Sequence, residues 1–406
     1  MTVMHMSRPS VEPGASDPAG LTATALSLRF TGSGSEYFRI WMVNLLLMLV
    51  TIGLYYPYAR ARRLRYFYAN TLLDGQPLGF HGSPGQMMRG YLLVLTLVGG
   101  VQLLSQLSPV VAGLAPLVFL LVWPALWCAA LRFRLGNTSW RGLHLRFSGS
   151  VRGACAALWA GPGLLVAAVL VAALLAQQLF AVDAQATGPS GVAVLVALAL
   201  PLSMLFFAPF LMWRVRRYQH RNLCYAAEVT GFDASLRAFV GVWFKAMLIG
   251  LGGGVAVGVA AALLVFSGVF NGFVSGVRQP SATTVLLAVG GGIVLWGTMV
   301  AVVSSYLAAR VQNLCWNHTR SARVSFDSRL SVGAMLRLSL KNSLLTVLTL
   351  GLYRPFAAVA MARLRLESVT VQVLGDPTQW ASPRPEGADG AAGDVAGDLL
   401  GIDLGL

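Results

Sequence analysis

Long runs of apolar residues, separated by short basic segments, form the main pattern of this 406-residue chain. A helix of about 20 apolar residues can cross a hydrocarbon core of roughly 30 Å. The pattern predicts six such spans, over residues 90–108, 110–131, 154–180, 191–213, 239–268 and 284–308. Six helices of this kind exceed what the core of a soluble protein can bury. The chain is therefore predicted to be a polytopic membrane protein.

Two shorter apolar runs, residues 40–58 and 343–360, lie outside these spans and carry one motif, which the second run repeats 298 positions after the first. A glycine and a proline near the end of each run are expected to break the helix there. The matched positions are Asn44, Thr51, Gly53, Tyr55 and Pro57 in the first run, and Asn342, Thr349, Gly351, Tyr353 and Pro355 in the second.

The membrane topology of these two runs has two solutions. If both runs crossed the membrane, the six spans between them would place their basic flanks on opposite sides. In the first solution both runs are re-entrant elements that enter and leave on the cytoplasmic side. In the second, both runs span, which gives eight spans and periplasmic termini. We favour the first, because matched motifs usually share one environment.

The six long runs pair into three predicted helical hairpins, and short segments of a common plan follow the apolar elements. The plan is an arginine, an aromatic residue, an asparagine four positions later and a phenylalanine ten positions after that. Asn313 with Phe326 is a looser copy. The three best copies are Asn70 with Phe80, Asn137 with Phe147, and Asn222 with Phe232.

These connecting segments are predicted to form small β-hairpins or paired strands that cap the membrane domain from the cytoplasm. Asp74-Gly75 lies between two short β-forming stretches, and this dipeptide favours a tight hairpin turn. Residues 142–147 alternate in the same way. The fold class expected is thus an all-α polytopic membrane protein. It has three repeated transmembrane hairpins, two terminal Gly-Leu-Tyr-x-Pro helices that re-enter or span, and small cytoplasmic β-hairpins.

Three regions follow from composition. Residues 1–26 are rich in Pro, Ser, Gly and Ala and read as a flexible arm without the apolar stretch of a signal peptide. Residues 27–375 form the membrane domain. Residues 376–406 combine acidic residues with many Gly and Ala and are predicted to be a disordered tail.

Charge placement predicts the orientation. Four connecting segments hold 21 Lys and Arg residues, whereas the three connections between them hold only Arg278 and no other basic residue. Basic loops remain in the cytoplasm. The nine arginines expected to contact lipid phosphates are Arg60, Arg62, Arg63, Arg65, Arg132, Arg134, Arg214, Arg216 and Arg217.

Composition also narrows the function classes. The net charge is +15, but its arginines lie at membrane ends rather than in one soluble domain, so no nucleic-acid partner is expected. The expected partners are membrane lipids with anionic headgroups. No acidic residue falls within a predicted span, and no nucleophile motif, phosphate loop or metal-ligand spacing is present. No enzyme activity, catalytic residue, metal or cofactor is therefore expected.

The terminal motifs resemble a known family. The stretch from Phe30 to Arg60, the following Arg65 to Thr71, and Phe80-His81-Gly82 resemble the YjgN-like family of bacterial inner-membrane proteins. The run from Asn342 to Pro355 is similar to a second copy of the opening. The resemblance covers residues 26–376 and implies an inner-membrane location. That family has no assigned molecular activity, so the resemblance implies no catalytic or binding residue.

Two functional hypotheses remain open. Repeated hairpins with kinked, Gly-rich helices favour a transporter- or channel-like protein for a small solute or lipid. The alternative is a non-transporting scaffold or envelope-stress factor that binds anionic lipid or a partner through its arginine-rich cytoplasmic face. A polar cavity within the membrane would separate them. The asparagines of the motifs are the first polar residues to test.

A reporter enzyme fused after residue 376 tests the two topologies. We expect a cytoplasmic signal, because re-entrant terminal runs leave six crossings and place both termini on the side of the basic loops. A periplasmic signal would instead establish eight crossings.

Overall fold

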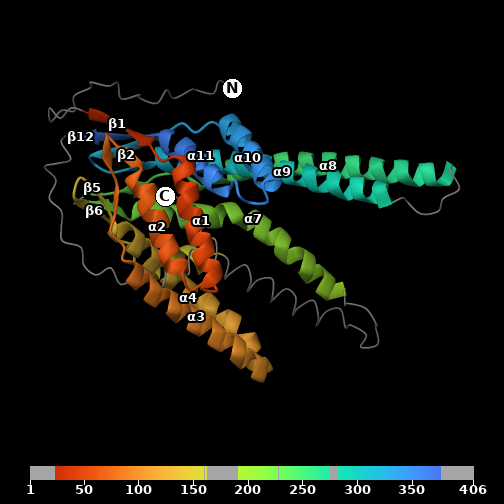
Figure 1. Ribbon diagram of the computed structural model, residues 1–406, viewed down its shortest axis with the longest axis horizontal. Coiled ribbons are helices and arrows are strands. Elements are labelled where there is room, and N and C mark those ends of the chain that lie inside the picture. Colours follow the sequence, from red (N-terminus) through yellow and green to blue (C-terminus); the bar gives the residue numbers. More distant parts are fainter. Residues whose placement is uncertain (1–22, 160, 162–190, 227, 275–281, 376–406) are drawn as a thin grey trace.

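The computed structural model describes residues 23–159, 161, 191–226, 228–274 and 282–375. Most of the chain is helical, and the helices extend from one end of the molecule, where short strands gather (Figure 1). Most of the predicted span over residues 154–180 lies outside the described residues.

The helices come in successive pairs that leave the strand end and return to it. In sequence order the pairs are α1 (Gly34–Val50) with α2 (Tyr56–Ala69), α3 (Pro84–Leu107) with α4 (Pro109–Gly136), α5 (Val151–Trp159) with α7 (Gly191–Arg221), α8 (Leu236–Val274) with α9 (Ala282–Asn317), and α10 (Val332–Leu348) with α11 (Arg354–Glu367).

The strands form two antiparallel sheets. One has the order β3-β2-β1-β12-β11-β10-β9 and the other β4-β5-β6-β7-β8. Their bounds are β1 (Ala23–Phe30), β2 (Thr71–Leu73), β3 (Gln76–Pro77), β4 (Gly79–Phe80), β5 (Thr138–Trp140), β6 (Leu143–Phe147), β7 (Leu223–Tyr225), β8 (Glu228–Val229), β9 (Gly231–Phe232), β10 (Thr319–Arg320), β11 (Val324–Ser328) and β12 (Val369–Leu374).

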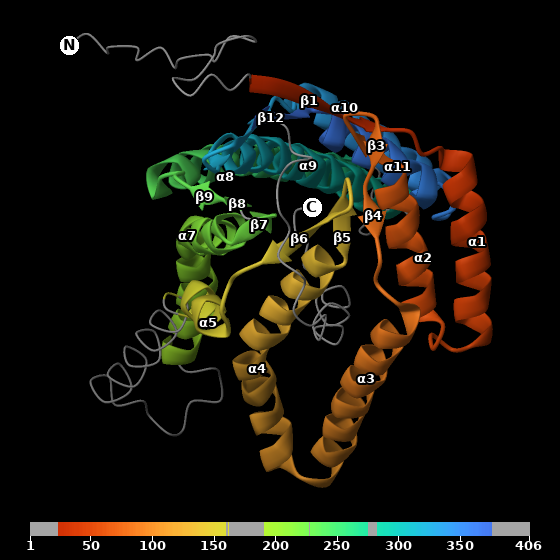
Figure 2. The same ribbon diagram turned by 90° about the vertical axis from the view of Figure 1, so that its left-hand side faces the viewer.

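The two sheets together close a strand ring. Only Leu78 separates β3 from β4, and only Thr230 separates β8 from β9, so the sheets adjoin at both ends. The first strand pairs with the last, with Leu26 opposite Val371. Figure 2 shows the strands around this ring, with the helices arranged about it.

The interior of the strand ring is packed with apolar side chains from several strands. Leu26, Trp140, Ala226 and Val373 are buried in one cluster. The Trp140 indole donates to the Leu73 carbonyl at 3.1 Å, which satisfies its polar group across the ring. The ring is therefore a packed core.

The predicted Asp74-Gly75 hairpin is present, but the prediction did not include the pairing of this hairpin with strands from distant segments. Leu73 pairs with Gln76, and Asp74 and Gly75 take the positive φ angles of a tight turn. The expected all-α fold class holds in part, because most of the chain is helical but the short strands also form two sheets. Strands of two or three residues bury little surface alone, so they pair with strands from distant segments instead.

One contact recurs where each helix pair meets the next. Every outgoing helix begins at a serine whose hydroxyl accepts from the backbone N–H three residues on, at Ser33, Ser83, Ser150, Ser235 and Ser331. The carbonyl just before each serine accepts a side-chain hydrogen bond from a returning helix. The five pairs are Arg65 to Gly82, Arg132 to Gly149, Trp213 to Ala234, Asn313 to Leu330, and Arg363 to Gly32, at 2.8–3.1 Å.

We call these five contacts the junction bonds. The last of them joins α11 to the residues before α1, so the series closes on itself. Asn313 occupies the place of the junction arginines. The sequence alignment that matched Asn313 with Asn222 was therefore wrong by five positions, because the residue at the end of α9 that corresponds to Asn222 is His318.

The returning helices end with a capping side chain. The amides of Asn70, Asn137 and Asn222 each donate to the carbonyl four residues earlier, at 2.7–2.9 Å. The His318 ring lies 2.9 Å from the Leu314 carbonyl in the same position. These asparagines thus satisfy carbonyls that a helix end leaves without partners.

The two short apolar runs are helical hairpins rather than continuous helices. The chain turns at Ile52-Gly53 and again at Leu350-Gly351, and all four residues have positive φ. The Gly53 N–H donates to the Met48 carbonyl at 2.8 Å, which closes the C-terminal turn of α1. Both ends of each hairpin lie at the strand ring.

The shared spacing of the two motif copies has a structural cause in each hairpin. The amides of Asn44 and Asn342 donate across the hairpin to the Ala59 and Ala357 carbonyls, both at 3.4 Å. The hydroxyl of Thr51 donates to Leu47 and accepts from Tyr55, and Thr349 does the same with Leu345 and Tyr353. Pro57 and Pro355 are fully buried in the first turns of α2 and α11.

Three described helices are long and apolar enough to cross a membrane, over Pro84–Leu104, Leu236–Leu263 and Val289–Asn317. They match the first, fifth and sixth predicted spans. The runs 110–131 and 191–213 lie in α4 and α7, whose side chains are only partly described. Large apolar side chains cover the outer surfaces of α3 and α8. Such surfaces suit lipid contact.

Loss of a junction bond should destabilise the protein. Arg363→Met removes a charged donor from the Gly32 carbonyl, and we expect it to lower the free energy of unfolding by about 1.5–3 kcal/mol. The exposed Arg337 donates within its own helix, so Arg337→Met is the matched control and should be nearly neutral. Equal shifts in thermal midpoint for both variants would contradict the role of the junction bond.

The hairpin turn depends on a left-handed glycine. Gly351 has φ +93° and open space around it, so Gly351→Ala adds backbone strain without a clash and should cost about 1–2 kcal/mol. Gly85 lies in the first turn of α3, also in open space, and Gly85→Ala should be neutral or slightly stabilising. Thermal unfolding of both variants in detergent checks the difference.

Candidate anion-binding pocket at the basic end of α7

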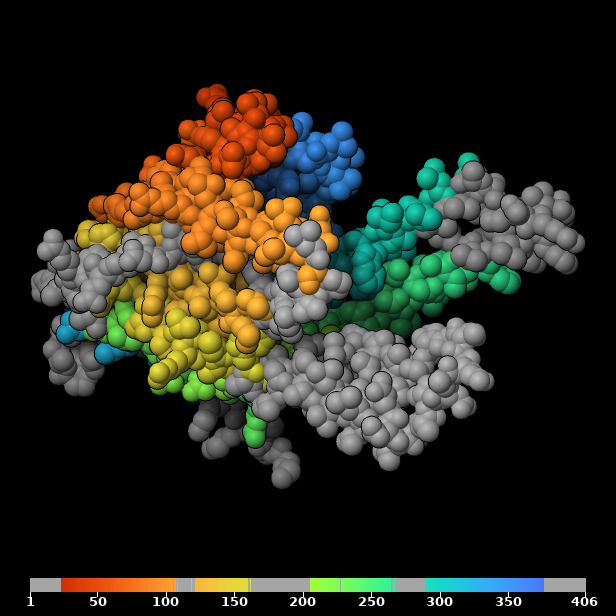
Figure 3. Space-filling model, turned by 90° about the horizontal axis from the view of Figure 1, so that it is seen from below, coloured from red at the N-terminus to blue at the C-terminus, as the bar shows by residue number. Residues whose placement is uncertain are grey.

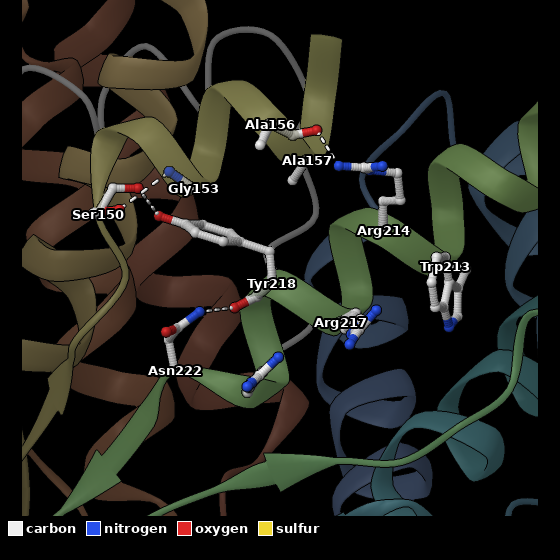
Figure 4. A pocket seen from close by; sticks show the side chains of 10 residues that line it. Ser150, Gly153, Ala156, Ala157, Trp213, Arg214, Arg217, Tyr218 and Asn222 are labelled. Atoms are coloured by element: carbon white, nitrogen blue, oxygen red, sulfur yellow. Dashed lines mark hydrogen bonds between the residues drawn. The ribbon is translucent and has the colours of Figure 1, made fainter. Parts of the chain in front are cut away.

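A pocket of about 480 Å³ lies where α7 approaches the strand ring. Figure 4 shows that two elements supply its lining, the start of α5 and the facing side of α7. The lining residues are Ser150, Gly153, Ala156, Ala157, Trp213, Arg214, Arg217, Tyr218, Arg221 and Asn222.

Three arginines from one helix face supply the positive charge. Arg214, Arg217 and Arg221 are spaced by three and four residues, which places them on one side of α7. Within the part of the chain that the structure describes, no carboxylate lies within 4.0 Å of their guanidinium groups. No acid in the described part of the chain therefore neutralises their charge.

Local contacts orient two of these arginines. The Arg214 guanidinium donates to the Ala156 carbonyl at 2.6 Å, which joins α7 to α5. The Arg217 guanidinium lies 5.1 Å from the centre of the Trp213 ring, within the range of a cation–π contact. The aromatic face orients Arg217 without using its N–H donors.

Arg217 does not donate to the junction carbonyl, because Trp213 forms the junction bond in its place. Arg217 lies five residues before Asn222, the position from which Arg65 and Arg132 bind the next carbonyl. Here the Trp213 indole donates to the Ala234 carbonyl at 2.9 Å. No hydrogen bond from Arg217 to another protein group occurs among the described residues. This substitution of roles leaves an exposed guanidinium at the pocket.

The polar side of the pocket is held rigidly. The Tyr218 hydroxyl donates to the Ser150 carbonyl at 2.8 Å, and the Asn222 amide donates to the Tyr218 carbonyl at 2.7 Å. Burial raises the pKa of the Tyr218 phenol, so it stays protonated at neutral pH. The site thus combines cationic donors with a neutral, fixed wall. This arrangement suits an anion with several acceptor oxygens, such as a phosphate group.

The other predicted arginines do not gather on one surface. Arg60 is buried, and Arg65 and Arg132 form junction bonds. The remaining contacts are Arg62 with Asn44 at 3.4 Å, Arg63 over the Phe67 ring at 5.9 Å, and Arg216 with Gln219 at 3.2 Å, whereas Arg134 is half-buried near the end of α4.

The phenylalanines and histidines of the connecting segments contact other protein side chains rather than lining the pocket. Phe80 and Phe147 are buried beneath the strand ring, and Phe232 is half-buried there. The rings of His81 and His144 lie 5.2 Å apart. His220 is buried beside the Thr319 hydroxyl at 3.0 Å. Within the described ranges, no group of three or more His, Cys, Asp or Glu could hold a metal ion.

Sequence reasoning found part of this pocket. It selected Arg214, Arg217 and Asn222, but it omitted Arg221 and gave no role to Trp213. The spacing of 214, 217 and 221 along one helix face was a usable signal. No sequence signal pointed to Ser150, because it reaches the site from a segment 60 to 70 residues away.

Comparisons with known proteins agree with the membrane features. The chain is 32% identical over 149 residues to the inner membrane protein YjgN of Salmonella typhimurium, which covers 36% of this chain and 37% of that protein. It is 30% identical over 128 residues to YjgN of Escherichia coli K12, covering 31% and 32% respectively. The matched part thus spans about a third of these relatives. No solved structure matches the chain.

A family match covers nearly the whole described fold. Residues 25–399 match the family described as bacterial protein of unknown function (DUF898). This range includes the terminal hairpins, the strand ring and the arginine pocket. The chain therefore belongs to this family of bacterial proteins of unknown function and is a YjgN-like inner-membrane protein.

Proposed function

We propose that this protein is a multi-pass inner-membrane protein that binds the phosphate of an anionic lipid headgroup in the pocket at the basic end of α7. The observation that carries the proposal is the group of three arginines that has no carboxylate partner among the described residues, at a site that Trp213 leaves open. The proposed role is binding rather than catalysis.

The position of the pocket favours a lipid ligand. The apolar run over residues 191–213 ends where Arg214 begins, so a membrane-crossing α7 would place the three guanidinium groups at headgroup depth. Basic groups at this level attract the anionic lipids of the cytoplasmic leaflet. The strand ring, which carries the other basic connections, would then face the cytoplasm.

The finer architecture is part of the same proposal. The five junction bonds support a chain built from five related helix pairs, of which the three long pairs cross the membrane and the two terminal pairs re-enter it. Among the described residues, the inside of the strand ring is packed with apolar side chains. Headgroup binding is therefore better supported than transport.

Removal of two pocket arginines tests the binding site. We expect Arg217→Gln with Arg221→Gln to weaken binding of phosphatidylglycerol in nanodiscs or detergent by about tenfold or more, since each lost charged hydrogen bond contributes about 1.5–3 kcal/mol. Native mass spectrometry or lipid-dependent thermal shift measures this change. Phosphatidylcholine should bind weakly to both proteins.

Two controls make the test specific. Arg237 is an exposed arginine at the start of α8, outside the pocket lining, and Arg237→Gln with Arg320→Gln removes the same charge. This variant should retain phosphatidylglycerol binding, and an equal loss would show that binding is non-specific attraction. Competition by inorganic phosphate distinguishes the two sources of the anion. If the pocket binds free phosphate, inorganic phosphate should displace phosphatidylglycerol completely at a similar concentration. If it binds the lipid headgroup, displacement should stay incomplete.

A further inference from the structure

We propose that the α1–α2 and α10–α11 hairpins insert together into the acyl chains of the membrane leaflet next to the strand ring, and that they stop within that leaflet. This inference concerns a surface separate from the arginine pocket, and it rests on membrane residence rather than on headgroup binding. Figure 3 shows the two hairpins side by side, red and blue, at one edge of the molecule.

The hairpin tips present apolar side chains without cover. Ile52 and Leu350 are each 94% exposed, and both have positive φ. This conformation is rare for residues other than Gly, and especially so for the β-branched Ile52. Each tip therefore holds a large apolar side chain outward at the position where a polar or small residue would suit a turn in water.

The exposed apolar surface has a limited depth. It continues down α1 to Val43, and the residues 43–50 rise about 12 Å in a helix, which is less than half of a hydrocarbon core of roughly 30 Å. The exposed members are Val43, Leu46, Leu49, Val50 and Leu54 on the first hairpin, and Leu344, Val347, Leu348 and Leu352 on the second.

The neighbouring span provides a second measure of depth. The Tyr56 ring, just after the first tip, lies 5.7 Å from the ring of Tyr91 on α3. The candidate span on α3 begins at Pro84 and continues to Leu104, so it extends 13 residues beyond Tyr91, or about 20 Å. The first hairpin thus ends within the first part of the path that α3 follows.

Charges set the limit on the second hairpin. Arg354 is exposed and lies two residues after Leu352, beside the tip. A guanidinium at the bilayer centre is costly, but a long side chain can reach back to the headgroups from a shallow position. The exposed Arg337 lies in the half of α10 nearer the strand ring, and the exposed Lys341 lies near the middle of this helix. The second hairpin is thus expected to insert by about two helical turns at most.

The two hairpins form one unit because their helices pack directly. Phe38 of α1 lies against Phe356 of α11 with ring centres 5.6 Å apart. The Arg363 junction bond to Gly32 fixes the base of the same contact. The tip of the first hairpin also adjoins α3, through Tyr56 and Tyr91, so the surface continues that of a candidate membrane span. Acyl chains are therefore the occupant that this surface fits.

Depth-dependent quenching in lipid vesicles tests the proposal on the full chain. Single cysteines at Ile52→Cys and Leu350→Cys, in a Cys155→Ser background, are labelled with an environment-sensitive fluorophore; the other native cysteines are buried. Nitroxides placed near the start of the acyl chain should quench both labels more than nitroxides placed near its end. Leu97→Cys in the middle of α3 should show the reverse order, and the exposed Gln76→Cys should be quenched only from water.

The other outcomes would overturn the proposal. Labels at 52 and 350 that are quenched from water, or that follow the depth profile of the label at 97, would exclude shallow insertion. An apolar emission spectrum without lipid quenching would show that a second copy or another protein covers the tips. These readouts do not depend on Arg217 or Arg221. A failure here therefore leaves the lipid-binding test unaffected, and a failure of that test leaves this one unaffected.

Discussion

The fold depends on satisfying the backbone carbonyl that precedes each outgoing helix. At this point the chain leaves a strand and enters a helix, so the carbonyl has no partner in either element. A side chain from a returning helix supplies the donor at all five junctions, as in Arg132 to Gly149 and Arg363 to Gly32. An unsatisfied buried carbonyl would cost about 1–3 kcal/mol at each place. Because Arg363 reaches the first junction, the same interaction also joins the two ends of the chain.

The junction bonds also explain why the strands can be so short. A strand of two or three residues is held by the helix that precedes it and the helix that follows it, and both helices are fixed at the junction. The strand ring then needs only to pair adjacent segments and to pack Trp140, Leu26 and Val373 inside. The long helices extend from this base and expose their apolar surfaces, which lipid rather than protein can cover.

The arginine pocket arises from a change of partner at one junction. At the junction to Gly82 an arginine donates to the carbonyl, but at the junction to Ala234 the donor is Trp213. The neighbouring Arg217 remains exposed on the same helix face as Arg214 and Arg221. A contact that is structural elsewhere thus yields a candidate binding group here, at the end of an apolar helix where lipid phosphates would lie.

The sequence by itself determined the membrane class, the positions of the long apolar helices that the structure describes, the Asp74-Gly75 turn and the matched terminal motifs. These features follow from local hydrophobicity and turn chemistry, which are readable within about 20 residues. The tertiary structure alone decided that Ile52-Gly53 reverses the chain, that β1 pairs with β12, and that Asn313 replaces an arginine at a junction. Each of these depends on a hydrogen-bond partner from a distant segment or on a backbone angle, and composition and spacing do not encode either one. For the same reason, the sequence selected Arg217 as a candidate, but only the contact of Trp213 with Ala234 showed why Arg217 does not form a junction bond.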